Sequence, residues 1–98
     1  MLVEIQCLAS PPGTPDDTYA HIDAAIGVIV ASGLRYEVGA LGTTIEGEPD
    51  DLWLLLRRVH EACLAAGADG LVSVIKVEQR ADTSDAAPTI DSLTAKHR

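Results

Sequence analysis

The stretch 34–47, which reads LRYEVGALGTTIEG, constrains the fold more than any other part of the chain. It holds two short β-prone runs, 34–38 and 43–46, joined by the loop GALG at 39–42. Glycine at both ends of a four-residue loop supplies the positive-φ positions of a tight reversal. Side chains alternate along both runs as they do in a half-buried hairpin. A hairpin this short is not stable alone in water, so other strands and helices must cover one of its faces.

Alternating apolar and polar residues predict one strand before the hairpin, over Leu2–Ser10. The prolines at 11 and 12 end it, because proline cannot donate to a ladder. A helix is then predicted to begin at Thr14, which can act as N-cap before Pro15 and two acidic residues. Gly33 ends this helix. Its predicted buried stripe has helical spacing and consists of Ile22, Ile26 and Ile29.

The same construction recurs after the hairpin. The run GEPDD at 47–51 copies GTPDD at 13–17 at an offset of 34 residues, and Gly67 lies at that same offset from Gly33. A last alternating strand is predicted over 71–79. The second helix is predicted to bury one face, which consists of Leu52, Leu56, Val59, Cys63 and Ala66.

Two strand–helix–strand units in tandem give the order βαββαβ. Since such crossovers are right-handed, the expected fold is an α+β, ferredoxin-like split βαβ. It has a four-stranded antiparallel sheet with both helices on one face and with the first and third strands central. This domain is expected over residues 1–80. Residues 81–98 are expected to form a tail, polar and mobile at first, that ends in a short helix capped by Thr89 and running through Ile90, Leu93 and Lys96.

Composition narrows the class of protein. A chain of 98 residues makes one domain, and with no Phe and one Trp its core must be aliphatic. The formal net charge of −8 repels phosphate backbones, so nucleic acid is not an expected partner. The first residues read as a strand and not as a leader, and no run of 18 apolar residues occurs. We therefore expect a cytoplasmic protein without membrane contact.

No catalytic or metal-binding group of residues emerges from the sequence. Cys7 and Cys63 fall on apolar faces, which predicts buried free thiols and not a disulfide or a metal pair. His21, His60 and His97 are expected at the surface, and no pair of them has the spacing of zinc ligands. We expect no enzymatic activity, no metal and no resident cofactor.

Two further features leave the function open. The loop 39–42 precedes a strand and not a helix, so it is not a phosphate-binding loop. Trp53 stands at the start of the second helix. It is either an exposed anchor for a partner or a side chain packed on its own loop.

The sheet face that the helices leave uncovered carries the most informative surface. It combines apolar residues with several acids around a single lysine. Like charges repel unless a partner offsets them, and a second copy of the same face can satisfy both kinds of residue by isologous pairing. We therefore predict a homo-oligomer, either a dimer or a tetramer, with a solvated face in a monomer as the alternative. The predicted interface consists of Glu4, Gln6, Leu8, Val74, Lys76 and Glu78.

Several of these runs resemble the small YkoF-like thiamine-binding proteins. The resemblance rests on IxxxGLRYEVGALGTTIEG at 29–47, HEACLAAGA at 60–68 and SVIKVEQR at 73–80, and it covers about residues 1–80. The pattern Gly-Thr-x-Ile-Glu-Gly at 42–47 is its most specific part. The resemblance implies a ferredoxin-like fold and assembly through the sheets into dimers or tetramers. It also implies binding of thiamine, or of its hydroxymethylpyrimidine half, without turnover.

The hairpin residues suit such a ligand. A carboxylate such as Glu37 or Glu46 can accept from the amino group of an aminopyrimidine, and Thr43 or Thr44 can donate to the ring. Tyr36 can stack on the ring or on the cationic thiazolium. These five residues are the predicted ligand site.

Three functions compete at this point. Non-enzymatic binding of thiamine or its pyrimidine moiety, in vitamin salvage or delivery, is the leading hypothesis. The alternative is an interaction or regulatory module that uses the open sheet face to assemble and takes no small ligand. An enzyme of the acylphosphatase kind ranks last, because it needs a cationic phosphate cradle and the loops here are acidic.

Overall fold

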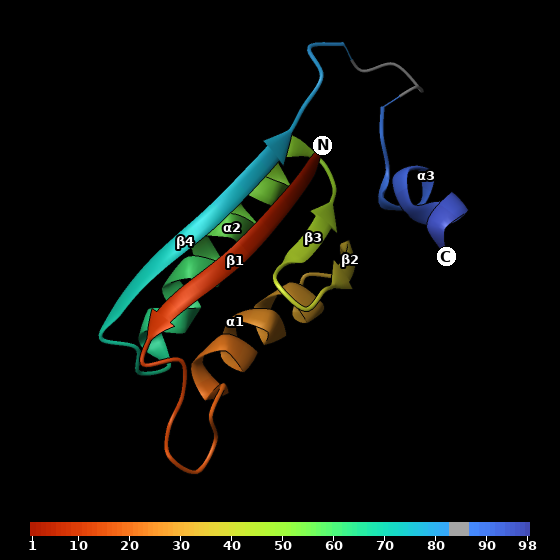
Figure 1. The fold of residues 1–98 in the computed structure, drawn as a ribbon. Helices are drawn as coiled ribbons and strands as arrows, with labels where there is room; N and C mark the ends of the chain where they lie inside the picture. The colour runs from red at the N-terminus through yellow and green to blue at the C-terminus, as the bar shows by residue number, and fades with distance from the viewer. Residues whose placement is uncertain (83–86) are drawn as a thin grey trace.

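The computed structural model describes residues 1–82 and 87–98, and its elements follow the predicted order βαββαβ (Figure 1). The strands are β1 Leu2–Ser10, β2 Arg35–Val38, β3 Thr43–Glu46 and β4 Gly70–Glu78. The helices are α1 Ala20–Ala31, α2 Pro49–Ala65 and α3 Ile90–Thr94, with a 3-10 turn over Ala95–His97. The ferredoxin-like fold predicted from the sequence is confirmed.

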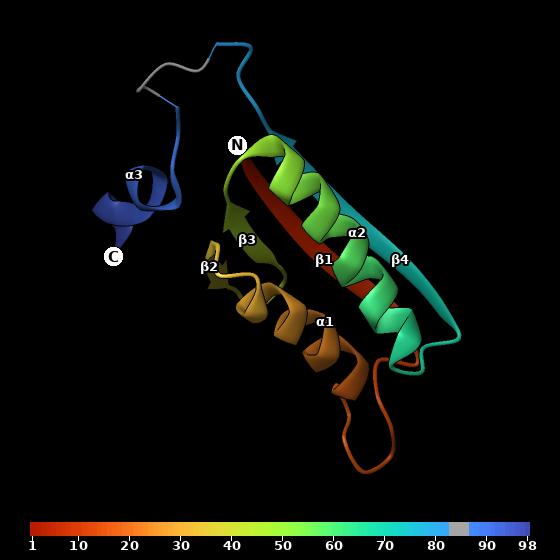
Figure 2. The ribbon, with the colours of Figure 1, turned by 180° about the vertical axis from the view of Figure 1, so that it is seen from behind.

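The strands form one antiparallel sheet in the order β2-β3-β1-β4, so β1 and β3 are central, as predicted. The helices α1 and α2 pack against each other and cover one face, which Figure 2 shows from the helix side. Strand β1 has nine residues but β3 has only four, and the two pair only from Leu2 to Ile5 of β1. Among the described residues, the stretch 6–10 of β1 therefore pairs with β4 on one edge and with no strand on the other.

The core between the sheet and the helices is aliphatic, as the composition predicts. Its buried members include Val3, Ile5 and Ile45 from the strands and Leu52, Leu55, Leu56, Val59 and Cys63 from α2. The predicted face of α2 differs in two respects, because Ala66 is exposed and Leu55 is buried. In the described part of the chain, no helix has the length and apolar composition of a membrane span.

The first helix begins later than predicted, since α1 starts at Ala20 and not at Thr14. Residues 14–17 close into a turn instead. In it, the Thr14 N–H donates to the Asp17 carbonyl oxygen at 2.8 Å, and the Asp17 N–H donates to that of Thr14 at 3.2 Å. The Thr14 hydroxyl also accepts from the Asp17 N–H at 3.1 Å. These local bonds use the groups that would otherwise start a helix, whereas the copy of this run opens α2 at Pro49 as predicted.

The later start goes together with a different buried face on α1. The buried residues of α1 are His21, Ala25 and Ile29. Of the predicted stripe, only Ile29 is fully buried, while Ile22 and Ile26 are half-buried. Successive residues of a helix point about 100° apart, so the two isoleucines lie beside the core-facing stripe and not within it.

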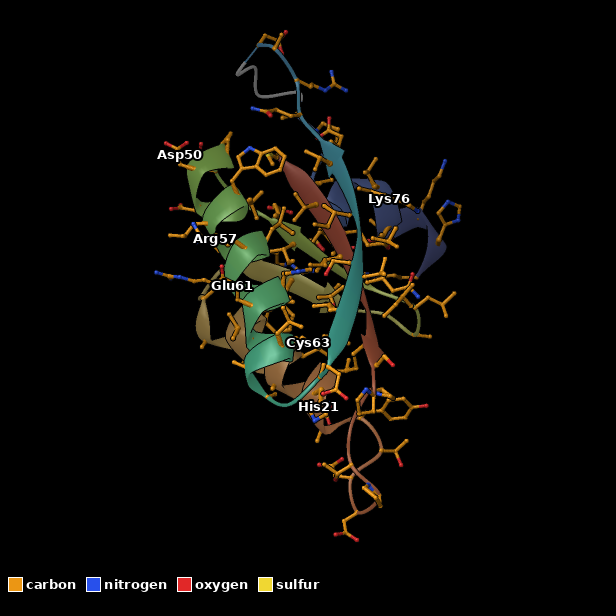
Figure 3. All side chains as sticks on the ribbon, turned by 90° about the vertical axis from the view of Figure 1, so that its left-hand side faces the viewer. His21, Asp50, Arg57, Glu61, Cys63 and Lys76 are labelled. Carbon is orange, nitrogen blue, oxygen red and sulfur yellow. The ribbon has the colours of Figure 1, made fainter. Side chains whose placement is uncertain are left out.

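His21 is only 4% exposed, so the prediction that it lies at the surface is wrong. Its Nδ1–H donates to the Pro11 carbonyl oxygen at 2.7 Å, and its ring packs at the end of α2 (Figure 3). Gly67 has φ +133° there, and a Cβ on it would lie 2.8 Å from Nε2 of His21. Glycine is therefore required at this position for both conformation and space. His21 joins the loop after β1 to the end of α2.

The tail forms the short helix that the sequence predicts, and α3 lies beside β2 and β3 (Figure 1). Thr89 caps it, since its hydroxyl accepts from the Ser92 N–H at 2.9 Å. Ile90 is buried, and its N–H donates to Oε1 of Glu46 at 2.8 Å. The stretch predicted to be mobile includes residues 83–86, which lie outside the described residues.

Candidate functional site

Two hollows lie on either side of the hairpin loop, and Gly39 and Gly42 line both. The larger hollow, which we call the edge cleft, measures about 490 Å³ and lies between α1, the loop and β1. The smaller hollow, which we call the tail cleft, measures about 270 Å³ and lies between the open sheet face and α3. Pockets for small ligands usually measure about 300–1,000 Å³, so the edge cleft is the hollow of ligand size.

The edge cleft exists because the hairpin is shorter than β1. Thr43, the first residue of β3, pairs with Ile5, and the loop closes there through a bond of 2.8 Å from the Gly39 N–H to the Gly42 carbonyl oxygen. A Cβ on Gly42 would lie 3.3 Å from the Ile5 carbonyl oxygen, so the loop packs tightly on β1 at this point. Beyond it, the edge of β1 that lacks a described strand partner borders the cleft.

Apolar, aromatic and polar side chains meet in the edge cleft. Its walls include the apolar side chains of Ile22, Ile26 and Leu41, the ring of Tyr19, the carboxylate of Asp23, and the polar side chains of Cys7 and Thr43. An apolar slot with one aromatic ring, one carboxylate and a few donors and acceptors suits a flat ring with polar edges and a positive charge. The half-buried positions of the two isoleucines are explained by this cleft.

The tail cleft combines residues of the open sheet face with residues of α3. Its walls include Leu2, Glu4, Glu37, Thr44, Ile90, Leu93 and Thr94. Two carboxylates and two hydroxyls give it acceptors, but it has no aromatic side chain among these residues. Its volume lies below the usual range for small-molecule pockets.

The five predicted ligand residues do not meet in one hollow. Tyr36 and Thr43 lie on the helix-covered face, where Tyr36 packs against the core and Thr43 lines the edge cleft. Glu37 and Thr44 are cross-strand partners on the open face and line the tail cleft. Glu46 lines neither hollow, because its carboxylate is bonded to the backbone of α3. The role of these residues in binding stays a prediction.

Ion pairs fasten α3 to the hairpin on the open face. Arg35 lies 2.9 Å from the Asp91 carboxylate, Arg98 lies 3.2 Å from the same oxygen, and Arg98 also pairs with Glu37. The hydrogen bond from Arg35, together with its charge, holds the pKa of Asp91 below its ordinary value. These side chains are largely exposed, so each pair contributes little on its own, and the group acts as a network.

The predicted interface residues share the open face, as their cross-strand pairing shows. Glu4 pairs with Lys76 and Gln6 with Val74. The Lys76 ammonium lies 3.5 Å from a Glu4 oxygen, and Figure 3 shows Lys76 on the side of β4 away from α2. Glu78 continues this row at the end of β4. An ion pair therefore offsets part of the acidic charge within one copy.

An apolar strip interrupts this charged face. Leu8 and Val72 are cross-strand partners and are 50% and 62% exposed, and Val74 beside them is 45% exposed. Exposed apolar residues are common one at a time, but a contiguous group points to a contact surface. No described segment of the chain covers this strip.

Sequence reasoning missed three residues of the edge cleft, which are Tyr19, Asp23 and Leu41. The buried stripe predicted for the first helix consists of Ile22, Ile26 and Ile29 and includes neither Tyr19 nor Asp23. For Leu41 the sequence does hold a signal, because an apolar residue in a tight loop is unusual. In the structure its side chain is 80% exposed.

The remaining candidate residues occupy varied places. His60 is half-buried, not at the open surface, and its Nδ1 lies 2.6 Å from Oγ of Ser73. His97 is exposed, as predicted, and Trp53 is 52% exposed, which leaves its indole available to a partner. Within the described ranges, no group of three or more His, Cys, Asp or Glu side chains is arranged to hold a metal ion.

Solved structures share this architecture. A structure from Bacillus cereus, described as a domain of unknown function DUF77, has a TM-score of 0.80 and 39% sequence identity, and covers 100% of this chain and 91% of that one. A Thermotoga maritima protein named for thiamine biosynthesis or salvage has a TM-score of 0.76 over 100% of both chains. At 24% identity, the likeness to that second protein concerns the fold alone.

The sequence also has curated relatives. UPF0045 protein CPE1503 of Clostridium perfringens is 32% identical over 80 residues, which make up 82% of this chain and 80% of that protein. The sequence model of a family described as thiamine-binding protein matches residues 3–94. This match confirms the resemblance found in the hairpin, and the chain belongs to the thiamine-binding protein family.

Proposed function

We propose that the protein binds thiamine or its hydroxymethylpyrimidine moiety in the edge cleft, without turning it over. The family to which the chain belongs supports the class of ligand. The observation that carries the location is the convergence of an aromatic ring, a carboxylate and an unpaired strand edge in a hollow of about 490 Å³.

Each part of the ligand has a counterpart in this cleft. The amino group and ring nitrogens of the pyrimidine need an acceptor and donors, which the open backbone edge of β1 and the Thr43 hydroxyl offer. The ring of Tyr19 can stack on either heterocycle. The carboxylate of Asp23 offers a negative charge to the thiazolium cation.

Binding without turnover agrees with the chemistry of the walls. The only thiol in the cleft is Cys7, and burial raises the pKa of this thiol. A protonated thiol is a poor nucleophile. The residues that line the cleft also include no histidine that could act directly on a bound ligand as a general base.

Calorimetric titration with thiamine, thiamine phosphates and hydroxymethylpyrimidine tests the proposal. We expect Tyr19→Ala to weaken the binding of both thiamine and hydroxymethylpyrimidine by about 2- to 12-fold, since stacking contributes about 0.5–1.5 kcal/mol. Asp23→Asn should weaken thiamine by about fivefold, the range for an exposed charge pair. It should leave hydroxymethylpyrimidine unchanged, because that ligand lacks the thiazolium cation.

Asp50→Asn is the matched control, since it makes the same change of charge in the first turn of α2, away from both hollows. Absence of binding for every one of these ligands at millimolar concentration would refute the function. Binding that ignores Tyr19 and Asp23 but weakens in Glu37→Gln and Thr44→Ala would move the ligand to the tail cleft.

We also propose that the protein forms a homo-oligomer through the open sheet face. The exposed apolar strip of Leu8, Val72 and Val74 supports this assembly. Assembly is compatible with ligand binding, because the edge cleft opens toward α1 and the strip lies on the opposite face of the sheet. An interaction module without a ligand is the alternative function, and the titration above separates it from the binding protein.

A further inference from the structure

A cluster of four polar side chains lies between α2 and the sheet, one of them buried and three half-buried. Cys7 on β1 and Ser73 on β4 are direct cross-strand partners, with Sγ and Oγ 3.9 Å apart. His60 on α2 places Nδ1 at 2.6 Å from the same Ser73 oxygen. Cys63 follows one turn later on α2, on the side that faces the sheet (Figure 3). This cluster interrupts a core that is otherwise aliphatic.

The two thiols of the chain meet in this cluster. Cys7 packs against the core group that contains Cys63, and Ser73, which contacts Cys7, also contacts His60, one turn before Cys63 on α2. Both are free thiols. Since the chain has only two cysteines, each thiol has the other as its single possible partner within the molecule.

The two thiols differ in their access to solvent. Cys63 is 0% exposed, so no reagent reaches it directly. Cys7 is half-buried and lines the edge cleft. A small oxidant can therefore reach Cys7 through the edge cleft, whereas it cannot reach the buried Cys63.

We propose that Cys7 and Cys63 are a peroxide-sensitive thiol pair that closes reversibly into a disulfide between β1 and α2. Cys7 is the residue that meets the peroxide, and Cys63 is the residue that resolves the product. This site goes beyond ligand binding and does not depend on it.

The reaction proceeds in two balanced steps. The Cys7 thiol passes its proton through the Ser73 hydroxyl to Nδ1 of His60, and the thiolate sulfur attacks one oxygen of hydrogen peroxide. The O–O bond breaks, Cys7 becomes a sulfenic acid, and the leaving hydroxide takes the proton from His60 to form water. The Cys63 sulfur then attacks the Cys7 sulfur, the S–O bond breaks, and the departing hydroxide takes the Cys63 proton to form a second water. Two thiols are oxidised by two electrons, and one peroxide is reduced to two waters.

The surroundings of the pair keep both thiols reduced until peroxide reaches them. Burial raises the pKa of both thiols, so both are protonated at neutral pH and need a proton acceptor before they react. A disulfide is about 2.05 Å long, so the two sulfur atoms must also come together. The thiols therefore stay free until an oxidant reaches Cys7.

In the test, the whole protein is treated with hydrogen peroxide and then denatured in iodoacetamide. Its mass is measured by mass spectrometry. We expect the mass to fall by two hydrogen atoms, with no alkylation of either cysteine and full reversal by dithiothreitol. No variant is needed for this result, so folding of a mutant cannot obscure it. Three results would each overturn the proposal: two alkylated thiols, a disulfide that joins two chains, or Cys7 oxidised to sulfinic acid beside an alkylated Cys63.

Variants assign the role of each residue. Cys63→Ala should leave Cys7 as a sulfenic acid that dimedone traps, whereas Cys7→Ala should leave Cys63 reduced. Ser73→Ala should slow the oxidation about tenfold or more, because it removes the path for the proton, and Ser73→Thr should restore the rate, since threonine keeps the hydroxyl. An unchanged rate in Ser73→Ala would refute the path through Ser73.

Discussion

The carboxylate of Glu46 accepts the backbone N–H of Ile90 at 2.8 Å, so one side chain ties β3 to the first residue of α3. The hypothesis that Glu46 binds the ligand and the proposal of the edge cleft predict different results for Glu46→Gln. A charge-assisted bond to an aminopyrimidine contributes about 1.5–3 kcal/mol, so its loss would weaken thiamine roughly 10- to 150-fold. With the ligand in the edge cleft, we expect a loss under about threefold, measured calorimetrically at about 0.15 M salt.

Glu48→Gln is the control for Glu46→Gln, since it removes an exposed negative charge two residues away. A repeat at about 0.5 M salt removes the long-range attraction that any acid exerts on a cation. A tenfold loss that persists at high salt in Glu46→Gln alone would return the site to the hairpin and contradict the edge cleft.

At the scale of residues, the sequence predicts local hydrogen bonds and helix ends well, but it predicts poorly which side chains face the core. The cap at Thr89 and the stop at Gly33 follow from the chain near them and are correct. The directions of His21 and Ile22 depend on where α1 begins, and the closed turn at residues 14–17 decides that. Nothing in the propensities of Pro and Asp separates this turn from a helix start, since the same Pro-Asp-Asp sequence opens α2.

The short helix α3 illustrates how an element can depend on its contacts. It has five residues, and helices of this length are not stable alone. Its docking rests on the buried side chain of Ile90, on Glu46, and on the network in which Asp91 meets Arg35 and Arg98. The conformation of this element should therefore respond to the charge of Asp91.

We expect α3 to undock as the pH falls below about 4. The folded protein lowers the pKa of Asp91, first through the hydrogen bond from Arg35. The unfolded value is about 3.9, so the ionised carboxylate contributes stability that is complete above that pH and is lost as the pH falls through the folded pKa. The methyl resonances of Ile90 in an NMR titration report the change. In Asp91→Asn, α3 should already be loosened at neutral pH, and an identical acid transition in that variant would contradict the prediction.

At the scale of elements, the sequence predicts the strands and their lengths, but not the hollow that those lengths create. The run 2–10 reads as a long strand and 43–46 as a short one. Where the short strand lies along the long one depends on the register, which places Thr43 opposite Ile5. Register follows from packing against α1 and α2, and no local pattern states it.

The whole molecule carries a net charge of −8 and an uncovered apolar strip. Light scattering at tens of micromolar protein should show an oligomer, and Leu8→Glu or Val72→Glu should reduce it to a monomer, because the new charge would be buried in the contact. Val30→Glu is the matched control, since Val30 on α1 is as exposed as Leu8, at 50% each. Added salt should strengthen the assembly by screening the repulsion between acidic copies. If the wild-type protein is a monomer under these conditions, assembly through the open sheet face is refuted.

The fold of the whole molecule is the most predictable level, because the order of elements and the handedness of crossovers leave few alternatives. Residues 34–47 and their two flanking units are sufficient to predict the sheet order. Assembly was inferred at the same level, but it depends on a second molecule, and light scattering has to decide it.

The early end of β3 makes the size of the edge cleft adjustable by insertion. Adding two residues to each arm of the hairpin would extend its pairing past Ile5 and place backbone where the hollow now lies. Such a chain would gain ladder bonds along β1 and become a better-closed sheet, at the expense of the ligand-sized edge cleft. Loop insertions leave the core between β1, α1 and α2 untouched. The hairpin is therefore the segment by which evolution, or a designer, can retune this scaffold for larger, smaller or no ligands while the fold stays the same.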